Sequence, residues 1–111
     1  MVVRTYPTSA ETKLTIRELV RNNFRDPYSI KDAAISNSWQ TDRGLSISPT
    51  YFSVCIKFNS KNKFGGYNGR RKLLLAFQDA KIIETDFDSE LCDDTKRAMT
   101  YEPFQEIMNI K

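Results

Sequence analysis

The alternation of apolar and polar residues is clearest in the middle of the chain, where it predicts three strands. Between residues 51 and 58 successive side chains alternate, as in a strand with one buried face. Residues 71–78 are apolar on both faces, which is typical of a central strand covered on both sides. Residues 81–87 predict a third strand, joined to the second by a short hairpin connection at Asp79–Ala80. The residues expected on one face of each strand are Phe52, Val54, Ile56 and Phe58, then Leu73, Leu75 and Phe77, then Ile83, Thr85 and Phe87.

A helical repeat precedes these strands and predicts a helix over about residues 9–24. Thr8 is the expected N-cap, with Glu11 completing a capping box. Asp26–Pro27 ends the helix, because the residue before a proline is pushed out of the α region, and residues 26–29 predict a tight turn. The apolar face of the helix is formed by Ile16, Leu19, Val20 and Phe24.

Weaker patterns cover the rest of the chain. Residues 33–39 predict a half-buried strand with Ala33, Ile35, Asn37 and Trp39 on one face. Residues 40–50 have no clear period and predict a loop, and residues 88–99 predict an irregular segment or a short helical turn. Residues 101–108 predict a short terminal helix with Pro103 in its first turn and with Phe104, Ile107 and Met108 packed inward.

Composition adds bounds to this picture. The chain has 111 residues, of which 40% are hydrophobic and 28% charged, as is typical of one globular domain. We therefore expect a single domain over residues 1–111, with residues 1–7 as a flexible lead-in. The element order predicts an α+β fold, in which the N-terminal helix packs on a small antiparallel sheet of about four strands, followed by a short C-terminal helix or turn.

Charge is distributed in two blocks. The net charge of +3 is too small to indicate a nucleic-acid binder. A basic block contains Lys57, Lys61, Lys63, Arg70, Arg71 and Lys72; an acidic block contains Asp79, Glu84, Asp86, Asp88, Glu90, Asp93 and Asp94, with Lys81 as its one cation. The blocks are either two solvated faces that partly neutralise each other or a dipolar surface that selects a charged partner.

The loop between the first two strands is rich in Asn, Gly, Lys and aromatic residues. One interpretation is a compact loop held against the sheet by Phe64 and Tyr67. The other is a patch for an anionic or carbohydrate-like ligand, extended by the basic run Arg70–Lys72. Stacking of single-stranded nucleic acid on the sheet is a weaker hypothesis. The candidate binding residues are Asn59, Lys61, Asn62, Lys63, Phe64, Gly65, Gly66, Tyr67, Arg70 and Arg71.

Candidate catalytic and metal-binding residues are few. The chain has no histidine, which removes Ser-His and Cys-His nucleophile systems and the commonest metal ligand. The run from Asp86 to Glu90 is similar to the start of a calcium loop, but the sixth position is Leu91 and the twelfth is Arg97. The glycines of the loop are not followed by the Lys-Ser/Thr of a phosphate-binding loop. The sequence therefore predicts no enzyme, no cofactor and no metal site.

The two cysteines, Cys55 and Cys92, show no metal-ligand spacing. They are either two buried thiols or one disulfide, and the residues alone leave both open. A bridge would close a loop of roughly 40 residues and stabilise the fold by about 3–4 kcal/mol.

Several of these segments together resemble a known family. The segment from Asn59 to Gly69 resembles the pattern Asn-Ala-Lys-Asn-x-Phe-Gly-Gly-Tyr-Thr-Gly of small uncharacterised bacterial envelope proteins, many of them predicted lipoproteins. Residues 24–30 and 34–36 are similar to that family's Phe-x-Asp-Pro-Tyr-Ser-Ile and Ile-Ser element, and residues 92–93 and 101–104 to its closing Cys-Arg-Asp and Tyr-x-Pro-Phe. The departures are Ser60 for Ala, Asn68 for Thr and Asp93 for Arg.

The resemblance implies a periplasmic or outer-membrane-associated protein, tethered through a lipid anchor that this sequence does not contain. It also implies a Cys55–Cys92 disulfide and a partner that is another envelope protein, and it implies no activity. The expected function is a non-enzymatic structural or interaction module. The alternative is a small domain that binds an anionic ligand or glycan through residues 59–72.

Overall fold

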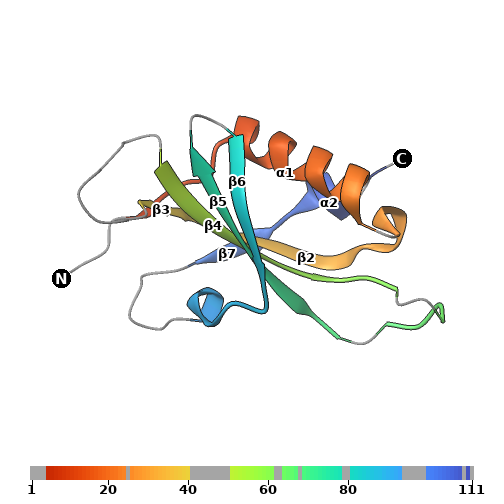
Figure 1. Cartoon of the computed structure of the whole chain (residues 1–111). Helices are drawn as coiled ribbons and strands as arrows, with labels where there is room; N and C mark the ends of the chain where they lie inside the picture. The colour runs from red at the N-terminus through yellow and green to blue at the C-terminus, as the bar shows by residue number, and fades with distance from the viewer. Residues whose placement is uncertain are drawn as a thin grey trace.

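The computed structural model describes residues 5–24, 26–40, 51–61, 64–67, 69–78, 81–93, 100–108 and 110. Its two α-helices, α1 and α2, lie on one face of an antiparallel sheet (Figure 1). In chain order the elements are β1 (Thr5–Tyr6), α1 (Ala10–Asn23), the 3₁₀ helix η1 (Pro27–Ser29), β2 (Lys31–Ser36), β3 (Ser38–Gln40), β4 (Tyr51–Asn59), β5 (Arg71–Gln78), β6 (Lys81–Phe87), the 3₁₀ helix η2 (Glu90–Asp93), β7 (Tyr101–Pro103) and α2 (Gln105–Met108).

Strand β4 is the centre of the sheet. It pairs along its length with β5, which pairs in turn with β6. Its other edge is shared by β2 and β3, and the short strands β7 and β1 pair with these two. The α+β class is confirmed, but the described residues contain seven strands rather than about four. The expected lead-in contributes one of them, since Thr5–Tyr6 pairs with β3.

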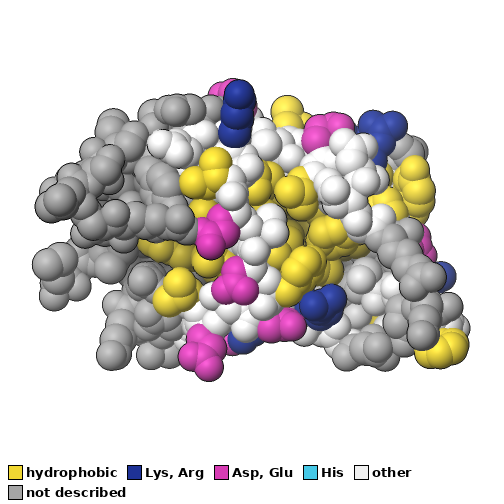
Figure 2. All heavy atoms as spheres, viewed as in Figure 1, with side chains coloured by type: hydrophobic (Ala, Val, Ile, Leu, Met, Phe, Trp, Pro, Cys, Tyr) yellow, Lys and Arg dark blue, Asp and Glu magenta, His cyan; other side chains and the backbone are white. Residues whose placement is uncertain are grey.

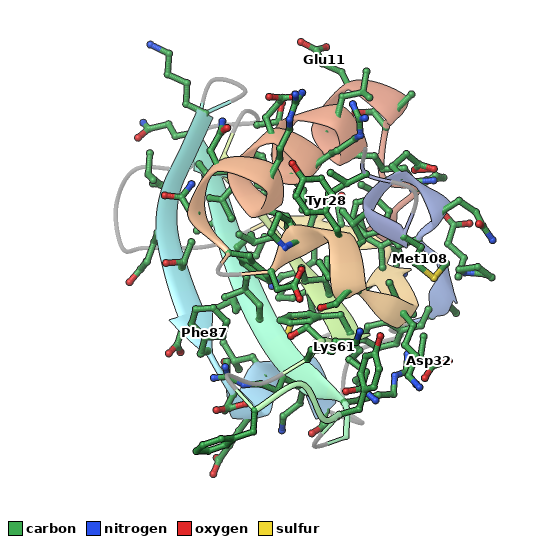
Figure 3. The ribbon with its side chains drawn as sticks, turned by 90° about the vertical axis from the view of Figure 1, so that its right-hand side faces the viewer. Glu11, Tyr28, Asp32, Lys61, Phe87 and Met108 are labelled. Atoms are coloured by element: carbon green, nitrogen blue, oxygen red, sulfur yellow. A yellow bond between two sulfur atoms is a disulfide. The ribbon has the colours of Figure 1, made fainter. Side chains whose placement is uncertain are left out.

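The main core lies between the sheet and the two helices (Figure 3). The inward faces of β4 and β5 are in register, with Val54 opposite Leu75 and Ile56 opposite Leu73. Ile16 and Val20 of α1 pack on them and are fully buried. The predicted inward faces of these two strands and of the helix are therefore confirmed.

Helix α1 begins one residue later than the capping box requires. Ser9 is the N-cap, and its Oγ accepts a hydrogen bond of 3.1 Å from the backbone N–H of Thr12. The expected cap, Thr8, is buried and donates its hydroxyl to the carbonyl of Ser36 at 2.7 Å. Thr8 thus joins the start of α1 to β2, and the cap at Thr8 was the wrong prediction. Ser9 has the same chemistry and is exposed.

The strand predicted over residues 33–39 is divided at Asn37, whose N–H donates to the carbonyl of Thr100 at 3.1 Å. This break changes which side chains share a face. Ala33 and Ile35 pack in the main core, whereas Trp39 packs with the cysteines on the opposite face. The prediction that all of these residues share one face was therefore wrong.

A bulge changes the pattern of β6. The register with β5 shifts between Ala76 and Phe77, so that Phe77 lies opposite Ile82 rather than Ile83. Ile82 packs against the core, and Ile83 is 46% exposed. The face predicted from strict alternation was wrong at Ile83, because the extra residue of a bulge interrupts the period of two.

The C-terminal segment closes the core from the end of the sheet. Pro103 lies in β7, opposite Ala34, and not in a helix as expected. A proline lacks the N–H that a strand interior needs, so it suits a short edge strand. The inward packing of Phe104, Ile107 and Met108 is confirmed. The predictions for residues 41–50, for Asp79–Ala80 and for residues 94–99 lie outside the described residues.

Candidate functional site

The candidate binding loop is the end of the β4–β5 hairpin. Its two sides meet at an isolated bridge between Lys61 and Tyr67. Gly65 and Gly69 have φ angles of +85° and +94°, which non-glycine residues rarely adopt. The sequence therefore needs glycine at these two positions for the chain to reverse.

Tyr67 braces one side of the loop on the body of the protein. Its hydroxyl donates to the carbonyl of Ser29 at 2.7 Å, and the Lys31 ammonium lies 3.8 Å from the centre of its ring. The N–H of Lys61 also donates to Ser29 Oγ, at 3.0 Å. Tyr67 thus pins the loop as predicted. Phe64, the other residue of that prediction, has 83% of its surface exposed.

Replacement of Gly65 by alanine is expected to lower the free energy of unfolding by about 1 kcal/mol. No described atom lies within 4 Å of the place a Cβ would take, so the cost comes from the positive φ and not from a clash. Gly65→Asn should cost less, because asparagine enters this region of φ more easily. Urea denaturation measures both variants. Equal losses for alanine and asparagine would show that backbone conformation is not the cause.

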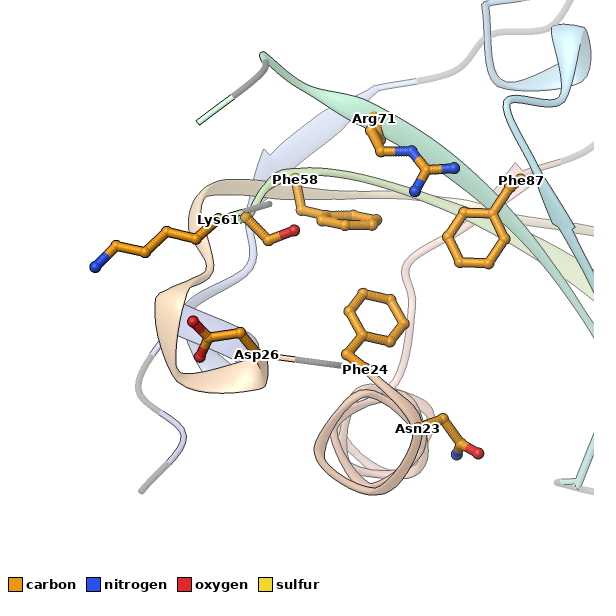
Figure 4. A pocket seen from close by; sticks show the side chains of 8 residues that line it. Asn23, Phe24, Asp26, Phe58, Lys61, Arg71 and Phe87 are labelled. Atoms are coloured by element: carbon orange, nitrogen blue, oxygen red, sulfur yellow. The ribbon is translucent and has the colours of Figure 1, made fainter. Parts of the chain in front are cut away.

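A cavity of about 260 Å³ opens at the foot of this loop, between the end of α1 and the ends of β4, β5 and β6 (Figure 4). Three phenylalanine rings form its apolar part. The ring centroid of Phe24 lies 5.2 Å from that of Phe58 and 6.2 Å from that of Phe87. The full lining is Asn23, Phe24, Asp26, Phe58, Ser60, Lys61, Arg71 and Phe87.

Arg71 supplies the charge beside these rings. Its guanidinium carbon lies 4.6 Å from the centre of the Phe87 ring, within the range of a cation–π contact. One guanidinium nitrogen also lies 3.4 Å from a carboxylate oxygen of Asp88, and both side chains are more than half exposed. Figure 4 shows the Lys61 ammonium and the Asp26 carboxylate on the side of the cavity away from Phe87. Among the described residues, Arg71 is therefore the cation closest to the aromatic part.

The opposite face of the sheet carries the disulfide. Cys55 of β4 is bonded to Cys92 of η2, and both are buried. Trp39 packs against the bridge, with Leu74 and Tyr101 at its margin. The Tyr101 hydroxyl donates to the carbonyl of Cys92 at 2.7 Å. Burial, together with the nearby Asp93 carboxylate, raises the pKa of Tyr101 to about 12.

The basic and acidic blocks meet beside the disulfide. Asp93 pairs with Lys72 and also with Lys57, whose ammonium lies 3.0 Å from a carboxylate oxygen. Hydrogen bonds from these lysines lower the pKa of Asp93, and the bond to Asp93 raises the pKa of Lys72. Together with the Arg71–Asp88 pair, these contacts favour the interpretation of two faces that partly neutralise each other.

The predicted loop residues separate into groups. Lys61 and Arg71 line the cavity. The outer loop holds residues 64–67, all of them exposed. The positive charge of Arg70 acts on Tyr101, on the disulfide face. Asn59 is buried, and its Oδ1 has no hydrogen-bond partner in the described part of the chain. Asn62 and Lys63 lie outside the described residues.

Sequence reasoning missed the other side of the cavity. Phe24 ends a helix and Phe87 ends a strand, and each was assigned to a core-facing pattern. No local motif joins them, because only the packing of α1 over the sheet brings them together. The one signal in the sequence was that each phenylalanine is the last residue of its predicted apolar face.

The described residues contain no group of His, Cys, Asp and Glu that could hold a metal ion. None of their helices is both long and apolar enough to span a bilayer. Comparison with protein-family models, with curated proteins and with solved structures gives no match for this chain.

Proposed function

We propose that this protein is a non-enzymatic structural or interaction module of the bacterial cell envelope, either periplasmic or lipid-anchored. The observation that carries the proposal is the buried Cys55–Cys92 disulfide. Structural disulfides persist in oxidising compartments such as the periplasm and are rare in the cytosol. The resemblance of the Asn59–Gly69 motif to small envelope proteins supports the same compartment.

The outer part of the β4–β5 loop is the proposed partner-binding surface. The Tyr67–Ser29 hydrogen bond braces one side of this loop, and Phe64 has 83% of its surface exposed. An exposed aromatic side chain on a braced loop loses little conformational freedom on binding, which favours its use as an anchor.

Affinity capture from a bacterial envelope extract tests this proposal. Wild-type protein is expected to enrich an envelope protein that Phe64→Ala fails to enrich. Leu14→Ala is the matched control, because Leu14 is an exposed apolar residue on α1, 53% exposed and outside the loop. Loss of the partner with both variants would reject the loop as the surface. Fractionation that finds the native protein in the cytosol with two free thiols would reject the envelope assignment.

The cavity favours a second candidate, a small binding domain for an anionic ligand or glycan. Lys61 and Arg71 of the predicted loop line this cavity next to the phenylalanine rings. In that case NMR signals of Lys61 and Arg71 are expected to shift when a small anion or an oligosaccharide is added. Capture with the Phe64→Ala variant should then equal capture with wild type.

A further inference from the structure

We propose that the cavity at the end of α1 binds a small aromatic carboxylate, either a free acid or the C-terminal aromatic residue of another chain. This inference rests on the second candidate function and names its ligand class. The juxtaposition that carries it is a set of three phenylalanine rings with one guanidinium beside them.

The size of the cavity fits one aromatic ring with a short substituent. A volume of about 260 Å³ lies just below the usual range for small-molecule sites, roughly 300–1,000 Å³. Phe58 is buried, whereas Phe87 is 44% exposed and reaches the surface. Aromatic rings attract one another at centroid distances of roughly 4.5–7 Å, so a fourth ring can join the Phe24–Phe58 and Phe24–Phe87 contacts.

The surface around the cavity is continuous with an apolar strip. Figure 2 shows hydrophobic side chains gathered between the helix α1 and the edge strand β6, with acidic side chains along β6. Ile82 of β6 and Phe24 at the end of α1 are partly buried and pack against the main core. An apolar ligand therefore has a surface to lie on, and Arg71 and Lys61 are the described cations of the lining that favour an anion.

The guanidinium of Arg71 can take a second carboxylate. Its contact with Asp88 joins a single nitrogen to a single oxygen at 3.4 Å, and a guanidinium carries five N–H donors. An exposed pair of this kind contributes little free energy, so a ligand can compete with it or share the cation. Asp26 is the one carboxylate among the described residues that line the cavity, and it lies away from Phe87 (Figure 4).

Polar ligands without a ring fit less well. Asn23 contributes a side-chain amide to the lining, but its N–H already donates to the carbonyl of Leu19 at 2.9 Å. Ser60 supplies one hydroxyl to the lining. A sugar needs several fixed donors and acceptors, whereas three of the eight lining residues are phenylalanines.

Titration of labelled protein with 3-phenylpropionate, followed by NMR, tests the proposal. We expect saturable shifts at Phe24, Ser60 and Arg71 with a dissociation constant on the order of 1 mM, as for a ligand of this size. The neutral analogue 3-phenylpropanamide should bind about tenfold more weakly, because it lacks the charge-assisted bond to Arg71. Equal binding of acid and amide would overturn the proposal.

A pair of neighbouring arginines provides matched variants. Arg71→Gln should weaken binding of 3-phenylpropionate about tenfold. Arg70→Gln removes the same charge from a residue that does not line the cavity, and it should leave binding unchanged. Phe87→Ala should also weaken binding, and the partial exposure of Phe87 makes this variant compatible with folding. Equal weakening by the two arginine variants would indicate only general attraction of an anion and reject the site.

The two sources of the carboxylate are separated with a peptide. The peptide Gly-Gly-Gly-Phe is compared with 3-phenylpropionate. If the peptide binds at least tenfold more tightly, and loses binding when its C-terminus is amidated, the cavity is assigned to a C-terminal residue. Weaker binding of the peptide assigns the cavity to a free acid. Sulfate or an oligosaccharide that shifts Lys61 and Arg71 while 3-phenylpropionate does not would reject this ligand class and keep the second candidate function. No shift with any of them would reject both.

Discussion

Replacement of Cys55 and Cys92 together by alanine is expected to lower the free energy of unfolding by about 3–4 kcal/mol, because the disulfide restricts the unfolded chain. The bridge spans 37 positions of sequence. It ties the centre of β4 to η2, a segment that is otherwise joined to the sheet by exposed ion pairs of Asp93 and by the Tyr101–Cys92 hydrogen bond. Small domains have net stabilities of about 5–15 kcal/mol, so this loss is a large fraction of the total.

Urea denaturation of the wild-type and double-alanine proteins measures this loss. Wild-type protein unfolded in the presence of a reducing agent should lose a similar amount, which separates the effect of the bridge from that of the new side chains. Titration of unreduced, denatured protein with a thiol reagent should find no free thiol when the protein is made under oxidising conditions. Two free thiols, or a double variant as stable as wild type, would contradict the role given to the bridge.

The sequence predicted the long elements of this fold because each has a periodic apolar face. Strands β4, β5 and β6 and helix α1 agree with the predicted ranges to within about two residues. The missed strands, β1 and β7, and β3, which the sequence merged with β2 into one predicted strand, have two or three residues each. A pattern that repeats every two residues cannot be detected over such a length, and these strands form because long-range partners are already in place.

Local irregularities account for the side chains that were assigned to the wrong face. The break at Asn37 moves Trp39 to the disulfide face, and the bulge moves Ile83 out of register. Neither the break nor the bulge occurs at a glycine or proline, the residues that would have indicated an irregularity in the sequence. A one-residue shift reverses every later side chain of a strand, so such breaks change the predicted surface more than the predicted strand.

Only the part of the candidate site that belongs to one loop could be predicted from the sequence. Lys61 and Arg71 belong to one loop and could be named from the sequence, whereas Phe24 and Phe87 come from elements far apart along the chain. The centroids of the two rings lie 6.2 Å apart because tertiary packing brings these elements together. A site made of one loop can be recognised as a motif, but a site made at the junction of a helix and a sheet needs the fold.

Replacement of Phe104 by alanine is expected to lower the free energy of unfolding by about 3–5 kcal/mol, the usual cost of removing a buried phenylalanine. Phe104 has 0% of its surface exposed and packs with Ile16 and Ile107 in the main core. Its backbone N–H donates to the carbonyl of Ala33 at 2.9 Å. The side chain thus stabilises the junction between β2, α2 and α1, and its loss leaves a cavity there.

Phe64→Ala is the matched control, because it makes the same chemical change at a residue that is 83% exposed; its effect should be below about 0.5 kcal/mol. Phe104→Leu keeps most of the volume and should cost about half of the alanine change or less, which gives a measurable variant where the alanine protein does not fold. Urea denaturation compares the three proteins with wild type. Similar losses of unfolding free energy at positions 64 and 104 would mean that the C-terminal segment does not close the core. A large loss at Phe104 alone would show that this closure stabilises the sheet on which the loop and the cavity depend.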